Sequence, residues 1–286
     1  PTIVEPGHIV GRMISYICWV AGLDKIVVVA PACHDTASAV AAVPGKGPNW
    51  AYVSSGTWSL LGTEEDSPII NDLSLTNNFT NEGGFNGKIR FLRNNMGLWL
   101  LTRCRLAWAN AGEEIDYHSL FAQALQSKPF KCVLDPDDHS FLNPPDMPAA
   151  IQAFCKRSET AVPRSKGEFV RTILESLALK YRFILDQINS MRAKPVERLH
   201  IVGGGSQNSL LNQFTANACG IPVTAGPVEA TALGNILIQA IAKGYLTGLS
   251  EAREVVAKSS DLREFEPADR DRWEEQYQTV KAYFRV

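Results

Sequence analysis

The feature that most limits the fold of this 286-residue chain is an apolar run that ends in three consecutive glycines. Arg198–Val202 is predicted to be a strand, Gly203-Gly204-Gly205-Ser206-Gln207-Asn208 follows it, and a helix is expected from about Asn208 to Cys219. Strands that alternate with helices indicate an α/β architecture. The glycines would let a ligand approach the backbone closely, but a tight turn without any ligand would favour them equally.

This turn does not match the common nucleotide-binding motifs. A dinucleotide fingerprint needs glycine at its first, third and sixth positions, and the sixth position here is Asn208. The sequence also lacks a Walker-type phosphate loop, a His-Glu-x-x-His metal motif and a Gly-x-Ser-x-Gly nucleophile elbow. No standard motif therefore decides the chemistry.

Composition excludes several kinds of partner. The formal net charge of -2, with both signs mixed along the chain, provides no positive field for nucleic acid or an anionic membrane. No apolar run approaches the roughly 20 residues that span a bilayer. The six cysteines lack the close pairing of a zinc site, so we expect no metal site from them and a reducing, cytoplasmic location.

Other segments extend the α/β pattern. Ile26–Ala30 is β-branched and apolar, which predicts a strand buried on both faces. Trp50–Leu61 is predicted to form two strands around the turn Ser54-Ser55-Gly56-Thr57. Further helices are expected over Asn94–Ala111, Lys166–Met191 and Glu229–Lys243, and Pro44-Gly45-Lys46-Gly47-Pro48 is the best candidate for a hinge.

Asp35 follows the predicted strand Ile26–Ala30, at the sheet edge where ligands bind in open α/β folds. A carboxylate there could accept the proton of a substrate hydroxyl. Asp is also a good helix N-cap, and on local chemistry alone the capping interpretation is favoured. His34 is a weaker indication of a site than Asp35, because it could equally be a hydrogen-bonded core residue.

Taken in order, six motifs resemble the FGGY carbohydrate kinases, and among them the rhamnulokinases. The motifs are His34-Asp35-Thr36-Ala37-Ser38-Ala39-Val40, Ser54-Ser55-Gly56-Thr57-Trp58-Ser59, Asn81-Glu82-Gly83-Gly84, Asn94-Asn95-Met96-Gly97-Leu98-Trp99-Leu100-Leu101, Gly203-Gly204-Gly205-Ser206-Gln207-Asn208 and Ala225-Gly226-Pro227-Val228-Glu229-Ala230-Thr231-Ala232-Leu233-Gly234-Asn235. Each is modest alone, whereas six in this order are specific. The residue after Asp35 is Thr36, where the glycerol and xylulose kinases have glutamine, which favours rhamnulose as the sugar.

The resemblance implies an actin-like, ribonuclease-H-like fold and the phosphorylation of L-rhamnulose with ATP and Mg²⁺. It implies that Asp35 is the catalytic base and that His34, Asp35 and Thr36 lie in the substrate pocket. It also implies an ATP site, with these positions: Thr57, Asn94, Thr102, Gly203, Gly204, Gln207 and Asn208. Thr102 stands where the family commonly has glutamine, and its shorter side chain is expected to reach less far toward the nucleotide.

The resemblance further implies that the chain is the carboxy-terminal part of such a kinase. Residues 1–45 would be the remnant of an amino-terminal, sugar-binding domain, and residues 46–286 the nucleotide-binding domain. The family's Asp-x-Gly-x-x-Ser phosphate turn does not precede Asp35, so the chain by itself is expected to be inactive. Ile26–Ala30 would then be an unpaired edge that could pair two chains by strand swapping. A fuculose or xylulose kinase, another ATP-using enzyme and a non-catalytic actin-like binding module stay open as alternatives.

Overall fold

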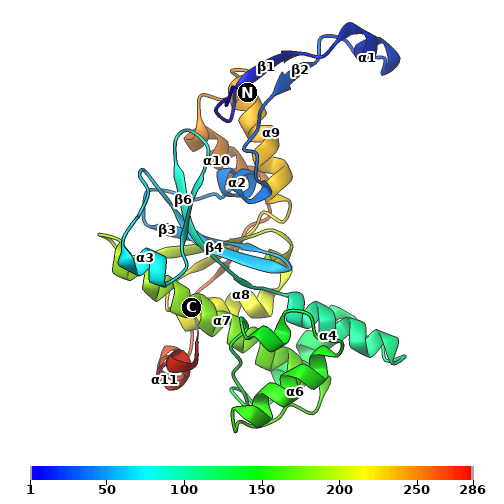
Figure 1. Cartoon of the computed structure of the whole chain (residues 1–286), viewed down its shortest axis with the longest axis vertical. Coiled ribbons are helices and arrows are strands. Elements are labelled where there is room, and N and C mark those ends of the chain that lie inside the picture. Colours follow the sequence, from blue (N-terminus) through cyan, green and yellow to red (C-terminus); the bar gives the residue numbers. More distant parts are fainter. Residues whose placement is uncertain (1, 285–286) are drawn as a thin grey trace.

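The computed structural model describes residues 2–284, which form a seven-stranded mixed sheet with helices on both faces and a projecting two-stranded ribbon (Figure 1). The sheet order is β5-β6-β4-β3-β7-β8-β9. Strand β3 is parallel to β7, and β7 is parallel to β8, whereas the other neighbours are antiparallel. The strands of this sheet are β3 Trp50–Ser55, β4 Trp58–Glu65, β5 Thr80–Gly83, β6 Ile89–Met96, β7 Arg198–Val202, β8 Val223–Ala225 and β9 Arg263–Phe265.

The two faces of the sheet carry different helices because successive side chains of a strand point to opposite sides. On β3, Tyr52 belongs to a buried cluster with α2 and α9, whereas Ala51 and Val53 belong to a larger cluster with α7 and α8. The helices are α1 Ser15–Val20, α2 Asp35–Ala41, α3 Asp72–Thr76, α4 Trp99–Asn110, α5 Tyr117–Gln126, α6 Met147–Arg157, α7 Lys166–Met191, α8 Ser209–Cys219, α9 Ala230–Ala242, α10 Leu249–Ser259 and α11 Arg270–Val280.

Helix α2 packs closely on α9 (Figure 1). A Cβ atom built on Gly234 of α9 would lie 1.7 Å from the carbonyl oxygen of Ser38 in α2, so only glycine permits this approach. Near the start of α9, the Thr231 hydroxyl donates a 3.3 Å hydrogen bond to the Asp35 carbonyl oxygen. The helix that begins at Asp35 is therefore fixed against the helix that follows β8.

Most of the predicted helices and strands are confirmed, and the residues that begin and end the helices can be identified. Helix α7 spans Lys166–Met191 as expected, and a capping box between Ser165 and Glu168 sets its start. Helix α8 ends at Cys219 because Gly220 adopts the left-handed conformation, with φ of 68°. The expected helix over Asn94–Ala111 is partly wrong, since residues up to Met96 belong to strand β6, which pairs with β4, and α4 begins at Trp99.

The prediction that Ile26–Ala30 is a strand buried on both faces is wrong. The segment forms β2 Val27–Val29, which pairs antiparallel with β1 Ile9–Arg12 in the projecting ribbon (Figure 1). The Val28 side chain is 40% exposed, because the ribbon has no third strand and no helix over it among the described residues. Strand β1 occupies one edge of β2, so the other edge is the unpaired one among the described residues, and pairing of two chains through it stays a prediction.

Among residues 2–284, no helix has the length and apolar character needed to cross a membrane.

Candidate functional site

The site lies where two parallel strands end side by side. Ser54 of β3 is paired with Val202 of β7, so the turn after β3 and the glycine turn after β7 leave the sheet at the same edge. Carboxyl ends of parallel strands are where ligands bind in open α/β sheets. The sequence motifs that begin at Ser54 and Gly203, 149 positions apart in the chain, are brought together in this way.

The three glycines of the second turn serve different purposes. Gly203 has φ of 85°, and an added Cβ would lie 2.9 Å from the carbonyl oxygen of Ser55. An added Cβ on Gly205 would lie 1.9 Å from the Ser55 hydroxyl, so this glycine is required for packing of the two turns. Gly204 is exposed and would meet nothing within 4 Å. Only Gly204 is therefore free to accept a ligand against its backbone.

A cavity of about 380 Å³ opens beside Gly204. It brings together five residues of the predicted ATP site, namely Thr57, Thr102, Gly204, Gln207 and Asn208. Its other lining residues were not predicted, and they are Gly56, Leu98, Leu101, Tyr117, Phe121 and Gly205. Tyr117 and Phe121 lie one helical turn apart at the start of α5, a spacing that sequence analysis did not use.

The lining of this cavity fits the nucleoside of a nucleotide. Apolar and aromatic walls suit a flat base, and the open backbone at Gly204 permits close approach. Asn208 caps α8 by accepting a 3.0 Å hydrogen bond from the Leu211 amide, whereas its own Nδ2 is buried and has no hydrogen-bond partner among residues 2–284. A buried, unsatisfied amide beside a cavity is a donor that a polar ligand could satisfy.

A second cavity, of about 600 Å³, holds the predicted base. His34, Asp35 and Thr36 line it together with Thr57 and Asn94, and Trp58 and Glu82 are further lining residues. Thr57 borders both cavities, so a ligand that extends from Gly204 past Thr57 would approach Asp35. The arrangement is that of two neighbouring subsites.

Asp35 is the first residue of α2, while His34 takes the N-cap position without a side-chain cap. The capping interpretation therefore does not describe Asp35. Its Oδ1 accepts a 2.6 Å hydrogen bond from the Thr36 amide and lies 3.2 Å from His34 Nδ1, and its side chain is 75% exposed. The carboxylate has both a fixed orientation and a face open to a substrate.

Two predicted ATP-site residues do not line the nucleoside cavity. Gly203 lies beneath the turn against Ser55, and Asn94 lies on β6, paired with Leu60 of β4, in the cavity of Asp35. Among residues 2–284, no group of three or more His, Cys, Asp or Glu side chains is arranged to hold a metal ion.

Residues 51–243 match the FGGY family of carbohydrate kinases, C-terminal domain. The chain belongs to the FGGY family. Its α/β fold is the actin-like, ribonuclease-H-like fold of that family, as the motifs indicated.

Curated relatives of this FGGY chain include two rhamnulokinases. The one from Bacteroides thetaiotaomicron is 47% identical over 274 residues, which are 96% of this chain and 56% of the relative. The one from Bacillus subtilis is 41% identical over 270 residues, covering 94% of this chain and 55% of the relative. The chain thus spans about half the length of the curated relatives it matches.

Solved structures agree on the fold. A xylulose kinase from Rhodospirillum rubrum superimposes with a TM-score of 0.71 at 18% identity, covering 99% of this chain and 56% of that one. A Plasmodium falciparum glycerol kinase with ADP gives a TM-score of 0.65 at 14% identity, covering 93% and 53%. At these identities the likeness describes the fold alone.

Proposed function

We propose that this FGGY chain provides the nucleotide site and the catalytic base of an enzyme that phosphorylates L-rhamnulose at its 1-hydroxyl with ATP. The observation that carries the proposal is that Thr57 borders both the nucleoside cavity and the cavity of Asp35. A nucleotide whose base lies at Gly204 would direct its terminal phosphate past Thr57 toward Asp35. The two curated rhamnulokinases support the choice of sugar.

In this proposal, Asp35 removes the proton of the attacking hydroxyl as the oxygen–phosphorus bond forms and the bond to the leaving nucleoside diphosphate breaks. Phosphoryl transfer requires mainly positioning and charge stabilisation, so one oriented carboxylate suffices as the base. The Thr36 amide and His34 hold that carboxylate from one side and leave the other open. Asn94, beside Asp35, is placed to contact the transferred phosphate or the sugar.

ATP and Mg²⁺ are the cofactors that the family implies. The cavity at Gly204 fits the nucleoside, with Tyr117 and Phe121 as walls and the Asn208 amide as a donor. Mg²⁺, when bound, neutralises charge on the phosphates. We assign it no ligand among these residues.

We also propose that residues 1–45 belong to the sugar-binding domain and residues 46–286 to the nucleotide-binding domain. Large apolar side chains are exposed along the first of these segments, where Tyr16 is 70% and Trp19 is 78% exposed. Contiguous exposed apolar surface of this kind indicates an interaction surface. Because catalysis needs both domains, we propose that residues 1–286 alone are inactive.

The function is tested by measuring ADP release with L-rhamnulose for residues 1–286 alone and for the same residues joined to the amino-terminal half of the Bacteroides relative. We expect no turnover from the first protein and rhamnulose-dependent turnover from the second. Xylulose, fuculose and glycerol are the comparison substrates. Faster turnover of one of these would reject rhamnulose, and turnover by residues 1–286 alone would reject the requirement for a second domain.

The nucleotide site is tested by Gly204→Val. We expect the Kd for ATP to rise about tenfold, or about 1.4 kcal/mol, because the new side chain occupies the space of the ligand. The Tm should not change, since nothing lies within 4 Å of an added Cβ. Calorimetric titration of ATP into residues 1–286 measures the Kd.

The matched control is Gly205→Ala, at the adjacent position. Its Cβ would overlap the Ser55 hydroxyl, so we expect a loss of stability of about 1–3 kcal/mol from overpacking. Unchanged ATP affinity in Gly204→Val would show that the nucleoside binds elsewhere.

A further inference from the structure

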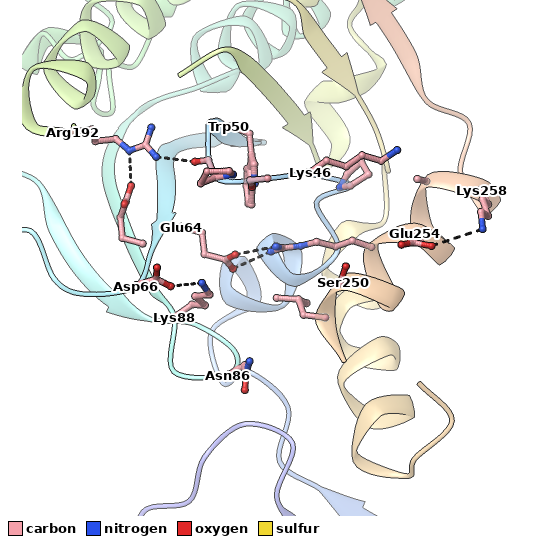
Figure 2. A pocket seen from close by; sticks show the side chains of 18 residues that line it. Lys46, Trp50, Glu64, Asp66, Asn86, Lys88, Arg192, Ser250, Glu254 and Lys258 are labelled. Carbon is pink, nitrogen blue, oxygen red and sulfur yellow. Dashed lines mark hydrogen bonds and ion pairs between the residues drawn. The ribbon is translucent and has the colours of Figure 1, made fainter. Parts of the chain in front are cut away.

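A charged cavity of about 900 Å³ is lined by the hinge residues, at the end of β3 opposite the turn that leads to Gly56 and Thr57. Figure 2 shows the side chains that line it. Its lining includes the hinge segment Pro44–Pro48, Trp50 at the start of β3, and Glu64 and Glu65 at the end of β4. Two arginines in this cavity are paired with these glutamates (Figure 2). Because neighbouring residues of a strand point to opposite faces, the two pairs act on different helices.

The first pair joins α10 to β4 and to α2. Arg253 of α10 forms a bidentate pair with Glu64, in which Nη1 and Nη2 lie 3.0 Å and 2.9 Å from the carboxylate oxygens. Its Nη2 also donates a 3.2 Å hydrogen bond to the carbonyl oxygen of Val40, in the last turn of α2. The Arg253 and Glu64 side chains are only 12% and 8% exposed, so this pair is shielded from competing water.

Trp50 completes the attachment of the hinge. The guanidinium of Arg253 lies 4.9 Å from the centre of the Trp50 ring, and Trp50 Nε1 donates a 2.9 Å hydrogen bond to the Gly47 carbonyl oxygen. An added Cβ on Gly45 would lie 2.5 Å from the indole, so the hinge rests directly on this ring. The segment that connects α2 to β3 is thereby held at both ends.

We infer that Arg253 is a positioning residue that fixes the angle between α2 and the nucleotide-binding sheet, and so the place of Asp35. This inference rests on the proposed function. Arg253 holds the carboxyl-terminal end of α2 at Val40, and Asp35 is at the other end of this helix, about 7.5 Å away along its axis. A tilt of about 10° at Val40 would displace Asp35 by about 1.3 Å, and a displacement of about 1 Å can cost about 100-fold in rate.

The second pair provides a matched control. Arg192, which follows α7, pairs with Glu65 through Nε at 2.7 Å and donates a 2.8 Å hydrogen bond to the Pro48 carbonyl oxygen. Like Arg253, Arg192 thus pairs with a glutamate at the end of β4 and bonds one backbone carbonyl, but that carbonyl belongs to the hinge and not to α2. Arg192 has no hydrogen bond to α2, however, so its removal should affect stability without displacing Asp35.

The test compares Arg253→Met with Arg192→Met in residues 1–286 joined to the amino-terminal half of the Bacteroides relative, the protein that we expect to be active. In Arg253→Met we expect amide hydrogen exchange of residues 38–43 to accelerate at least tenfold, and kcat for phosphorylation to fall about 10- to 100-fold with the KM for ATP unchanged. In Arg192→Met we expect a similar decrease in Tm, but neither faster exchange in residues 38–43 nor a lower kcat. Arg253→Lys, which keeps the charge and loses the bidentate geometry, should be intermediate.

Since Arg253→Met leaves Glu64 buried without its partner, Arg253→Met combined with Glu64→Gln is the variant to use if the single variant does not fold. Unchanged amide exchange of residues 38–43 in Arg253→Met, or in the double variant if that is the one that folds, would overturn the inference. This outcome does not depend on whether the enzyme is a kinase. Faster exchange without any sugar phosphorylation by the joined protein that carries no substitution would instead reject the proposed function. An equal loss of kcat in Arg192→Met would show that Arg253 stabilises the fold in general and does not position Asp35.

Discussion

Asp35→Asn is expected to lower kcat for sugar phosphorylation by about 10²- to 10⁴-fold, because asparagine keeps the shape of the side chain but accepts no proton. The side chain is 75% exposed, and asparagine can still accept the hydrogen bond from the Thr36 amide. We therefore expect the free energy of unfolding to change by less than about 0.5 kcal/mol. Coupled measurement of ADP release at saturating sugar and ATP, on residues 1–286 joined to the amino-terminal half of the Bacteroides relative, gives kcat.

Asp72→Asn is the matched control for this substitution. Asp72 is also exposed and also begins a short helix, α3, but it lies outside both cavities of the site. We expect wild-type kcat from Asp72→Asn. Retention of wild-type kcat by Asp35→Asn would reject Asp35 as the base.

Lys180→Met is expected to destabilise the chain by about 3–5 kcal/mol, because it removes a buried cation from between the buried Asp135 and the half-buried Asp137. The Lys180 side chain on α7 is fully buried, and its Nζ lies 2.9 Å from Asp135 and 3.0 Å from Asp137. Asp137 in turn accepts a 2.7 Å hydrogen bond from the Met96 amide at the end of β6. The cluster therefore joins the long loop before α6 to the core and to the strand that carries Asn94.

The effect is measured as a decrease of roughly 10 °C in Tm and a matching shift in the urea midpoint. Lys258→Met is the matched control, since Lys258 is 81% exposed and lies 4.0 Å from Glu254 on the same helix. Exposed pairs of this kind contribute between zero and about 1 kcal/mol. A decrease in Lys180→Met no larger than that in Lys258→Met would show that the buried cluster contributes no net stability.

Much of the fold was predictable because local signals and tertiary packing agree. The ends of α7 and α8 follow from side-chain capping at Ser165 and from the left-handed Gly220, which depend on nearby residues alone. The strand Arg198–Val202 has the apolar character of a position between two parallel neighbours, where both faces are covered. These helices and this strand can therefore be predicted without knowing which distant residues they contact.

The failures occurred where distant partners decide the structure. Asn94 and Met96 lie in a strand because β4 pairs with them along its whole length, which local propensity does not reveal. Val28 looks like a core residue by composition, but its burial depends on which elements lie over the ribbon. Tyr117 and Phe121 were missed as site residues because only the packing of α5 brings them to the glycine turn.

The sequence by itself determined that strand, glycine turn and helix follow one another here, and that a helix starts close to Asp35, before the segment Pro44–Pro48. Those features depend on backbone preferences of a few adjacent residues. Only the tertiary structure decided which glycine leaves open space beside its backbone, because that depends on Ser55, which occupies the space beside Gly203 and Gly205. Likewise, only packing revealed that Arg253 connects the helix of Asp35 to the sheet. Arg253 is 213 positions from Val40 in the sequence, and only the folded chain brings the two residues into contact.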